Sequence, residues 1–109
     1  MIFVNVEKTY DGKIRSFTMD GHADFADKGK DIVCAGASAV AFGSVNAIIA
    51  LTGIEPEIEQ SETGFLKCSF HTESTDESFN QVQLLLEGMI ISLQTIERDY
   101  QDYIKITFS

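Results

Sequence analysis

The chain contains no tryptophan, one proline and only two cysteines among its 109 residues. Two cysteines are too few for the disulfide framework that stabilises small secreted domains. Cys34 and Cys68 form no Cys-x-x-Cys pattern and have no pair of histidines near them, which argues against a zinc site. The first residues show no basic segment followed by a long apolar run, so no signal peptide is predicted. We therefore expect a cytoplasmic protein whose thiols stay reduced.

Basic side chains are also scarce. The sequence has 8 lysines and arginines against 17 acidic residues, which gives a formal net charge of −9. Because phosphate contacts need clustered Lys and Arg, direct binding of nucleic acid is not expected, whereas a basic partner would be attracted. The length suits one domain, and 44% hydrophobic residues are typical of a globular core. We expect residues 1–109 to form a single domain.

One long segment lacks charge altogether. Residues 32–51 form an apolar run that is long enough for a membrane span. The run is rich in alanine and glycine and contains polar side chains, which favours the central helix of a small domain and argues against a membrane helix. We expect its small residues to let neighbouring backbone come close; these are Ala35, Ala39, Gly43 and Ala47.

Alternation of apolar and polar side chains predicts strands, and apolar side chains at steps of three and four predict helices. Asp11-Gly12 predicts a hairpin turn, and Gly53 predicts the end of the first helix. The order ββαββαβ indicates an α+β domain in which two helices pack on a β-sheet. The expected strands are 2–7, 13–20, 57–60, 65–71 and 102–108, the helices are 32–52 and 73–98, and a loop covers 21–30.

The second helix has an apolar face that is wider than a single stripe. Leu84, Leu85, Ile90 and Ile91 widen it beyond the regularly spaced apolar residues. Either this helix is buried more deeply than usual, or it forms a subunit interface, as is common in small cytoplasmic proteins. The sequence leaves both interpretations open.

Cys34 and His22 are the candidates for chemistry. Asp31 is a preferred N-cap residue directly before the apolar run, which would place Cys34 in the first helical turn. Unpaired N–H groups and the positive end of the helix dipole favour a thiolate there, so we expect a lowered pKa for Cys34. The same N–H groups offer a site for a developing oxyanion.

His22 precedes Cys34 across a loop that is long enough to bring the imidazole to the thiol. Gly21 would let the backbone turn sharply before His22. Ser38 follows Cys34 by one helical turn on the same face, where it could orient a substrate group or the imidazole. With Asp31, these residues form one candidate site.

Each of these residues also has a purely structural interpretation. A cysteine in an alanine-rich helix, such as Cys34, is typical of a small core residue. Asp31 can be a simple N-cap, Ser38 can face a neighbouring element, and Gly21 can be an ordinary loop glycine. The sequence alone does not choose between these roles.

A metal site is not expected in the loop. His22, Asp24, Asp27 and Asp31 carry suitable ligand atoms, but their spacing does not match the EF-hand pattern. Cys68 lies on an apolar strand face and is expected in the core.

The segment from Gly21 to Ala39 resembles the signature of the ribosomal-processing cysteine proteases. Gly21-His22, a short acidic and polar loop, and then Gly-Lys-Asp-Ile-Val-Cys-Ala-Gly-Ala-Ser-Ala over residues 29–39 carry the resemblance. Gly36-Ala37 stand where relatives often have Ala-Ala or Ala-Val, which replaces one small residue with another. The length and the ββαββαβ order also fit, so the resemblance covers nearly the whole chain.

The resemblance implies a cytoplasmic, homodimeric cysteine endopeptidase that uses no cofactor. By motif match, Cys34 would be the nucleophile and His22 the general base, with Asp31 and Ser38 at supporting positions. Members of the family remove a short N-terminal extension from the twenty-seventh large-subunit ribosomal protein, cutting after a pair of aromatic residues. The acidic charge of this chain suits such a basic ribosomal protein precursor as substrate.

The resemblance also implies features of the substrate groove. The loop between His22 and Cys34 would be mobile and would order on the substrate. Cleavage after aromatic residues needs an apolar groove, which Phe25 or Phe42 could line.

A second class of function stays open at this point. A non-enzymatic, acidic ribosome-assembly or interaction module would also bind a basic protein, and Cys34 would then be a buried helix residue. Thiol reactivity separates the two hypotheses, because a catalytic Cys34 should react quickly with iodoacetamide below pH 7. A redox sensor is less favoured, since no second cysteine lies near Cys34 in sequence.

Overall fold

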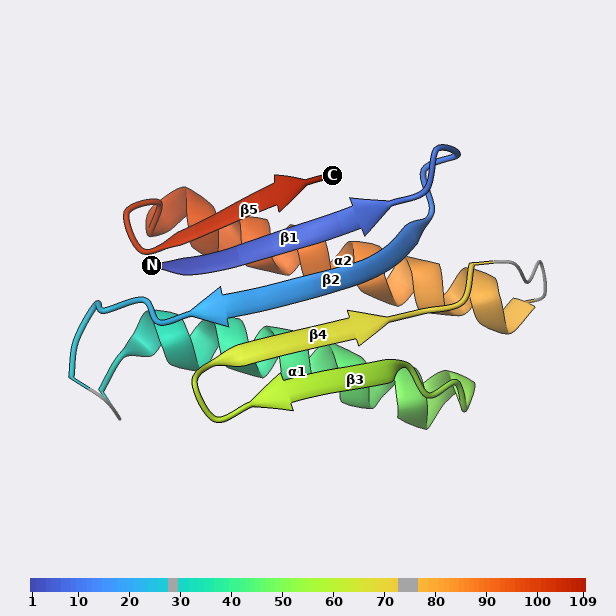
Figure 1. The fold of residues 1–109 in the computed structure, drawn as a ribbon, viewed down its shortest axis with the longest axis horizontal. Helices are drawn as coiled ribbons and strands as arrows, with labels where there is room; N and C mark the ends of the chain where they lie inside the picture. The colour runs from blue at the N-terminus through green and yellow to red at the C-terminus, as the bar shows by residue number, and fades with distance from the viewer. Residues whose placement is uncertain (28–29, 73–76) are drawn as a thin grey trace.

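The computed structural model describes residues 1–27, 30–72 and 77–109, and its elements follow the expected order ββαββαβ (Figure 1). The helices are α1 (Ile32–Thr52) and α2 (Glu77–Asp99). The strands are β1 (Ile2–Lys8), β2 (Ile14–Gly21), β3 (Glu57–Ser61), β4 (Phe65–Ser69) and β5 (Ile104–Phe108).

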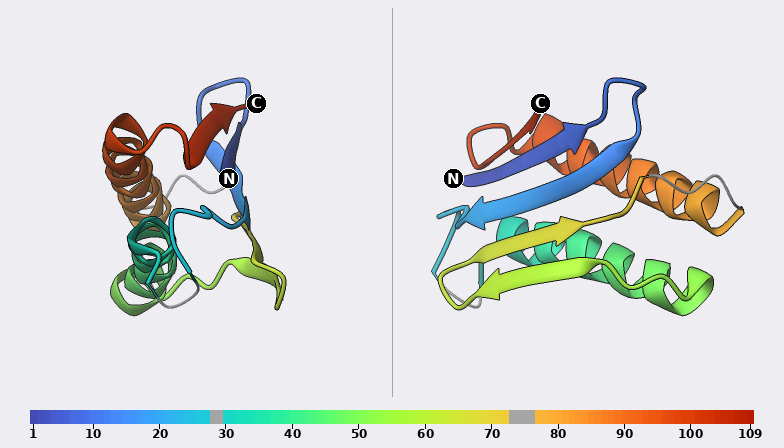
Figure 2. Two further views of the ribbon diagram at one scale, coloured as in Figure 1. Left: turned by 90° about the vertical axis from the view of Figure 1, so that its left-hand side faces the viewer. Right: turned by 45° about the vertical axis from the view of Figure 1, so that its right-hand side comes forward.

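The strands form one mixed sheet in the order β3-β4-β2-β1-β5. Neighbouring strands are antiparallel, except that β5 runs parallel to β1. Both helices cover the same face of this sheet, as the side view in Figure 2 shows. The arrangement confirms the predicted α+β class, in which each helix buries its apolar side against the sheet.

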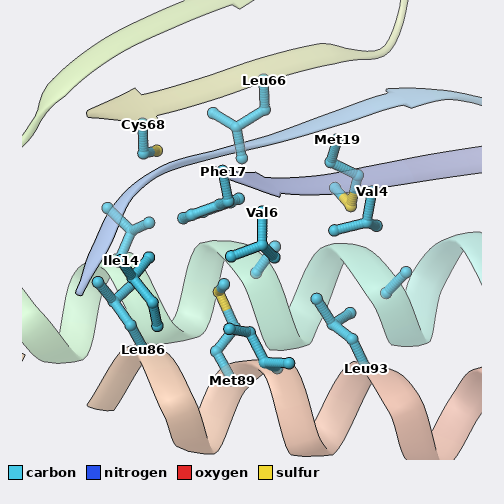
Figure 3. Packing of buried hydrophobic residues seen from close by; sticks show 14 of the residues in the cluster. Val4, Val6, Ile14, Phe17, Met19, Leu66, Cys68, Leu86, Met89 and Leu93 are labelled. Carbon is cyan, nitrogen blue, oxygen red and sulfur yellow. The ribbon is translucent and has the colours of Figure 1, made fainter. Parts of the chain in front are cut away.

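The core fills the space between the sheet and the helices. Alternate side chains of β1 and β2 point toward the helices, since a strand presents every second residue to one face. Cys68 on β4 is also fully buried in this core, as expected, and burial raises the pKa of its thiol to about 11. Core side chains labelled in Figure 3 include Val4, Val6, Phe17, Met19, Leu86, Met89 and Leu93.

Helix α1 begins and ends where the sequence predicts. Asp31 is its N-cap, and Gly53 ends it with a φ of 74° and an N–H that donates to the Ile49 carbonyl. By length and composition α1 could cross a membrane. In the structure it packs into the core, which is the position that the central-helix interpretation predicts. Its buried residues are Val33, Ala37, Ala41, Val45 and Ile48.

The small residues of α1 do not act as expected. Ala35, Ala39 and Gly43 are exposed, so the prediction that they admit a neighbouring backbone is wrong. Gly36 is the glycine of α1 that faces α2, and an added Cβ there would make ordinary van der Waals contact with Cδ1 of Ile96, at 3.6 Å. Helical spacing puts Gly36 on the side that faces α2 and the other three on the side away from it.

Helix α2 is buried along part of its wide apolar face. Ile90 is buried and Leu85 is half-buried, so both belong to the core or its margin. Leu84 and Ile91 are 69% and 64% exposed and lie two helical turns apart on the outward side. The subunit interface stays a prediction, and Leu84 and Ile91 are the side chains of α2 that would contact a second copy of the chain.

Some element boundaries differ from the predicted ones. β5 begins at Ile104 rather than at residue 102, because a turn closes α2 there and the Ile104 N–H donates to the Tyr100 carbonyl. β4 ends at Ser69. The predicted start of the second helix at residue 73 lies outside the described residues.

Candidate active site

Gly21 is the last residue of β2 and directly precedes His22. It has a φ of 92°, and a Cβ added there would collide with the carbonyl oxygen of Met1. Glycine avoids both the left-handed strain and the collision. The chain can therefore turn at the end of the strand, and it presents His22 as an exposed side chain.

Asp31 ties the start of α1 to the loop before it. Its Oδ1 accepts hydrogen bonds from the N–H groups of Val33 and Cys34, each at 3.0 Å. Its Oδ2 accepts one from the N–H of Phe25, also at 3.0 Å. These bonds, that from Cys34 above all, hold the pKa of Asp31 below its ordinary value. Asp31 is therefore charged at neutral pH, and its carboxylate both caps α1 and holds the loop at Phe25.

The loop after His22 is anchored at further points. The ring of Phe25 packs edge-on against Tyr100 and Tyr103, with centroid separations of 5.6 and 5.1 Å. The carboxylate of Asp24 lies 3.8 Å from the amino group of Met1. Phe25 thus packs against the end of α2 and the turn that follows it. The loop that was predicted to be mobile includes residues 28 and 29, which lie outside the described part of the chain.

Cys34 lies in the first turn of α1, as expected, but its surroundings differ from those expected. Its Sγ accepts a hydrogen bond from the N–H of Ala23 at 3.2 Å. Burial raises the pKa of the Cys34 thiol, and the carboxylate of Asp31 raises it further, against the opposite effect of the Ala23 N–H. The predicted lowering of this pKa is therefore wrong.

The reason is that Asp31 already occupies the amino end of the helix. The N–H groups of Val33 and Cys34 donate to its carboxylate, so neither is available to a thiolate or an oxyanion. The carboxylate also places negative charge near the sulfur. The thiol is therefore protonated at neutral pH in the free protein, and attack by Sγ needs a base that takes its proton.

His22 and Cys34 line the same cavity, which has a volume of about 580 Å³. Within the described residues, the imidazole of His22 makes no hydrogen bond, to Cys34 or to any other group, so it can turn toward the thiol without breaking one. No group of three or more His, Cys, Asp or Glu side chains in the same ranges is placed to hold a metal. The other residues that line the cavity are Asp24, Ala26, Asp31, Ala35, Ser38 and Glu62.

A second cavity, of about 370 Å³, adjoins the first and shares His22, Cys34, Ser38 and Glu62 with it. Phe42 lines this second cavity, whereas Phe25 lines neither and packs on the two tyrosines instead. The other walls of the second cavity combine apolar side chains of the sheet with polar ones: Ile2, Met19, Phe65 and Leu66, and Gln60, Ser61 and Glu62.

The residues singled out from the sequence therefore lie together. His22, Cys34 and Ser38 line both cavities, Asp31 lines the first, and Gly21 lines the second. The fold brings the end of β2 and the start of α1 to the same place, with the β3–β4 turn beside them (Figure 1).

Comparison with known proteins identifies the family. The model of the family described as cysteine protease Prp matches residues 1–105. The chain belongs to this family. It is 49% identical to the ribosomal processing cysteine protease Prp of Bacillus subtilis over 108 residues, which cover 98% of this chain and 96% of that protein.

Solved Prp structures share the fold along the whole chain. An essential ribosomal processing protease Prp from S. aureus, in complex with a covalently linked product peptide, is similar with a TM-score of 0.91 and 44% identity. The S. aureus protease with a substrate peptide gives a TM-score of 0.83 at the same identity of 44%. Both alignments cover 100% of each chain. Prp membership makes this chain a cysteine protease, which decides against the non-enzymatic interaction module.

Three parts of this Prp site were not predicted from the sequence. They are the Ala23 N–H on the sulfur, Glu62 in the cavity wall, and Gly64, at which an added Cβ would lie 3.0 Å from the imidazole of His22. Thr63-Gly64 is recognisable as a turn, but its sequence does not say what the turn packs against. That contact depends on the pairing of β4 with β2, which is a tertiary feature.

Proposed function

We propose that this protein is a ribosomal-protein-processing endopeptidase in which Cys34 is the nucleophile and His22 the general base. The observation that carries the proposal is that both side chains line one cavity, where the sulfur also accepts a hydrogen bond from the Ala23 N–H. A thiol beside an imidazole is the pair that acyl transfer through a thioester requires. Asp31 and Ser38 support this pair from α1.

The reaction starts from the protonated thiol. As Sγ of Cys34 attacks the carbonyl carbon of the scissile bond, the imidazole of His22 takes the thiol proton and the carbonyl oxygen becomes negative. The tetrahedral intermediate expels the amine, which takes the proton from His22, and a thioester remains on Cys34. A water molecule then gives a proton to His22 as it attacks the thioester. The C–S bond breaks, the leaving sulfur takes the proton from His22, and the peptide is released as a carboxylic acid, which restores the free thiol.

The backbone next to His22 assists this step. The N–H of Ala23 stabilises negative charge on the sulfur of Cys34, because it already donates to Sγ in the resting protein. Ala23 follows His22 directly, so one short segment supplies both the proton acceptor and the donor to sulfur. The bond from the Phe25 N–H to Asp31 holds this segment against α1.

The proposed substrate is the precursor of the twenty-seventh large-subunit ribosomal protein, cut after its aromatic pair. The apolar part of the second cavity, with Phe42 and Leu66 in its walls, suits aromatic side chains next to the scissile bond. The net charge of −9 attracts a basic protein. The S. aureus protease in complex with a substrate peptide supports a peptide as the ligand of this site.

Incubation with the precursor ribosomal protein, followed by mass spectrometry of the new N-terminus, tests the proposal. The native protein should make one cut, after the aromatic pair. Cys34→Ala, Cys34→Ser and His22→Ala should each lower kcat/KM by more than about a thousandfold, because each removes a group that acts in bond making.

Cys68→Ala is the matched control for the cysteine substitutions. Cys68 is fully buried on β4 and lines neither cavity, so this variant should lose stability and keep its turnover. Cleavage by Cys34→Ala at the native rate would remove Cys34 from the mechanism. A cut at another position would refute the proposed specificity and leave the nucleophile in place.

The cytoplasmic location, the homodimer and the lack of direct nucleic-acid binding remain predictions. Leu84 and Ile91 on the outward side of α2 are candidates for contact between two copies.

A further inference from the structure

The turn between β3 and β4 reaches the catalytic histidine. β4 pairs antiparallel with β2, and Met19 is the partner of Leu66 in this register. Continuing the register by two residues places Gly64 beside Gly21, immediately before His22. The turn is therefore built against the end of β2, far from it in sequence.

Gly64 leaves no room for a side chain on this turn. A Cβ added there would lie 3.0 Å from Cε1 and 3.1 Å from Nε2 of His22, and 3.1 Å from the carbonyl oxygen of Gly21. Such separations are shorter than ordinary van der Waals contact. The imidazole of His22 therefore lies in the space that a side chain at residue 64 would need. Of the three crowded atoms, those of the exposed imidazole can move most easily.

We propose that Gly64 is a positioning residue for His22. Because the imidazole makes no hydrogen bond within the described residues, packing against the turn is what sets its orientation beside the cavity. A side chain at residue 64 would push the imidazole off this surface, from which it turns to reach the thiol, and would so slow the transfer of the thiol proton. This inference rests on the proposed role of His22 as general base.

Gly12 provides a matched control, because its φ is close to that of Gly64 and it lacks the contact. Its φ is 85°, against 91° at Gly64, and an added Cβ would meet nothing within 4 Å. Both glycines lie in hairpin turns, so an alanine at either position carries similar left-handed strain. A difference between the two alanine variants then reports the contact with His22.

The test compares the cleavage kinetics of Gly64→Ala and Gly12→Ala. We expect Gly64→Ala to lower kcat by on the order of tenfold or more, since a displaced base slows proton transfer. Gly64 also lines the second cavity, so a rise in KM at the native kcat would report lost peptide binding and would contradict the positioning role. Gly12→Ala should stay within about twofold of the native kcat. Gly64→Asn, which tolerates a positive φ better and still carries a Cβ, serves if Gly64→Ala folds poorly.

Nuclear magnetic resonance of the imidazoles supplies a readout that a purely structural role would not move. The chain has two histidines, and His71 is exposed beyond the end of β4, so it serves as an internal reference. Gly64→Ala should shift the ring signals of His22 and leave those of His71 in place. Gly12→Ala should change neither.

The outcomes separate this inference from the proposed function. Full cleavage by His22→Ala would overturn both, because no base would be left for Gly64 to position. An inactive His22→Ala variant together with native kcat and native His22 signals in Gly64→Ala would overturn only the role of Gly64. A loss of kcat in Gly64→Ala without any shift of the His22 signals would also contradict it.

Discussion

Cys34 lies where opposing electrostatic effects meet. The amino end of a helix favours a thiolate, but the carboxylate of Asp31 takes up the N–H groups that would stabilise one. Burial and the charge of Asp31 together keep the pKa of Cys34 above its ordinary value. The thiol is thus stored in its neutral form, which limits unwanted oxidation or alkylation, and in the proposed mechanism His22 activates it.

Asp31→Asn tests this balance. Asparagine keeps an oxygen for the helix cap and removes the negative charge, so the pKa of Cys34 should fall. The rate of alkylation by iodoacetamide, measured against pH, should therefore rise at lower pH in the variant than in the native protein. Because fast alkylation needs the thiolate, the native protein should react slowly below pH 7, so the raised pKa of Cys34 overturns the sequence-based expectation of fast alkylation in that range.

Asp24→Asn is the control for charge at this site. Asp24 also raises the pKa of Cys34, less strongly than Asp31, so its variant should move the alkylation profile in the same direction by a smaller amount. Cys68 is fully buried with a pKa raised to about 11 and should not contribute to the signal. An unchanged or upward shift in Asp31→Asn would contradict this account of the thiol.

Among the elements, α2 and β2 are joined by one buried polar contact. The side chain of Gln83 accepts a hydrogen bond from the Ile14 N–H at 2.8 Å and donates one to the Ile14 carbonyl at 3.0 Å. Gln83 interrupts an apolar helix face, yet it satisfies both backbone groups at the start of the strand. It therefore fixes the position of α2 along the sheet.

Gln83→Leu should destabilise the fold, because both backbone groups of Ile14 would be left buried and unpaired. The expected loss is about 1–3 kcal/mol in the free energy of unfolding, measured by urea denaturation. Gln81→Leu is the control, since Gln81 is exposed on the same helix and should change stability by less than about 0.5 kcal/mol. Equal losses in both variants would show that the paired contact contributes nothing.

At the same scale, the sequence predicted the elements better than their surroundings. Periodicity and the cap residues Asp31 and Gly53 are local signals, so both ends of α1 could be placed. Which side of α1 faces α2 is set by tertiary packing, and for that reason the exposure of Ala35, Ala39 and Gly43 was not foreseen. The His22–Cys34 pair was found by residue type, whereas the sign of the Cys34 pKa shift depends on where the Asp31 oxygens point, which no local pattern encodes.

For the whole molecule, charge is the dominant feature. A net charge of −9 over 109 residues gives a field that draws a basic protein toward the site. The carboxylates of Asp24, Asp31 and Glu62 around the first cavity extend this field to the nucleophile. Long-range attraction of this kind acts on encounter more than on the chemical steps.

Ionic strength should therefore affect substrate capture selectively. Between about 0.01 and about 0.15 M salt the Debye length falls from about 30 to about 8 Å, so kcat/KM for a basic substrate should drop by up to about tenfold while kcat changes little. A peptide with the same cleavage site and neutral flanking residues is the control and should show a flat profile. A fall in kcat alone would locate the salt effect in the chemistry and contradict steering.

The central claim is that the acyl group passes through the sulfur of Cys34, and trapping this intermediate tests it most directly. A p-nitrophenyl ester of a peptide that ends in an aromatic pair should acylate the protein faster than the thioester is hydrolysed. After acid quenching, mass spectrometry should find the peptide acyl group on Cys34, and His22→Ala should accumulate it more slowly. An acyl group on any other residue, or an undiminished burst of nitrophenol from Cys34→Ala, would contradict the account.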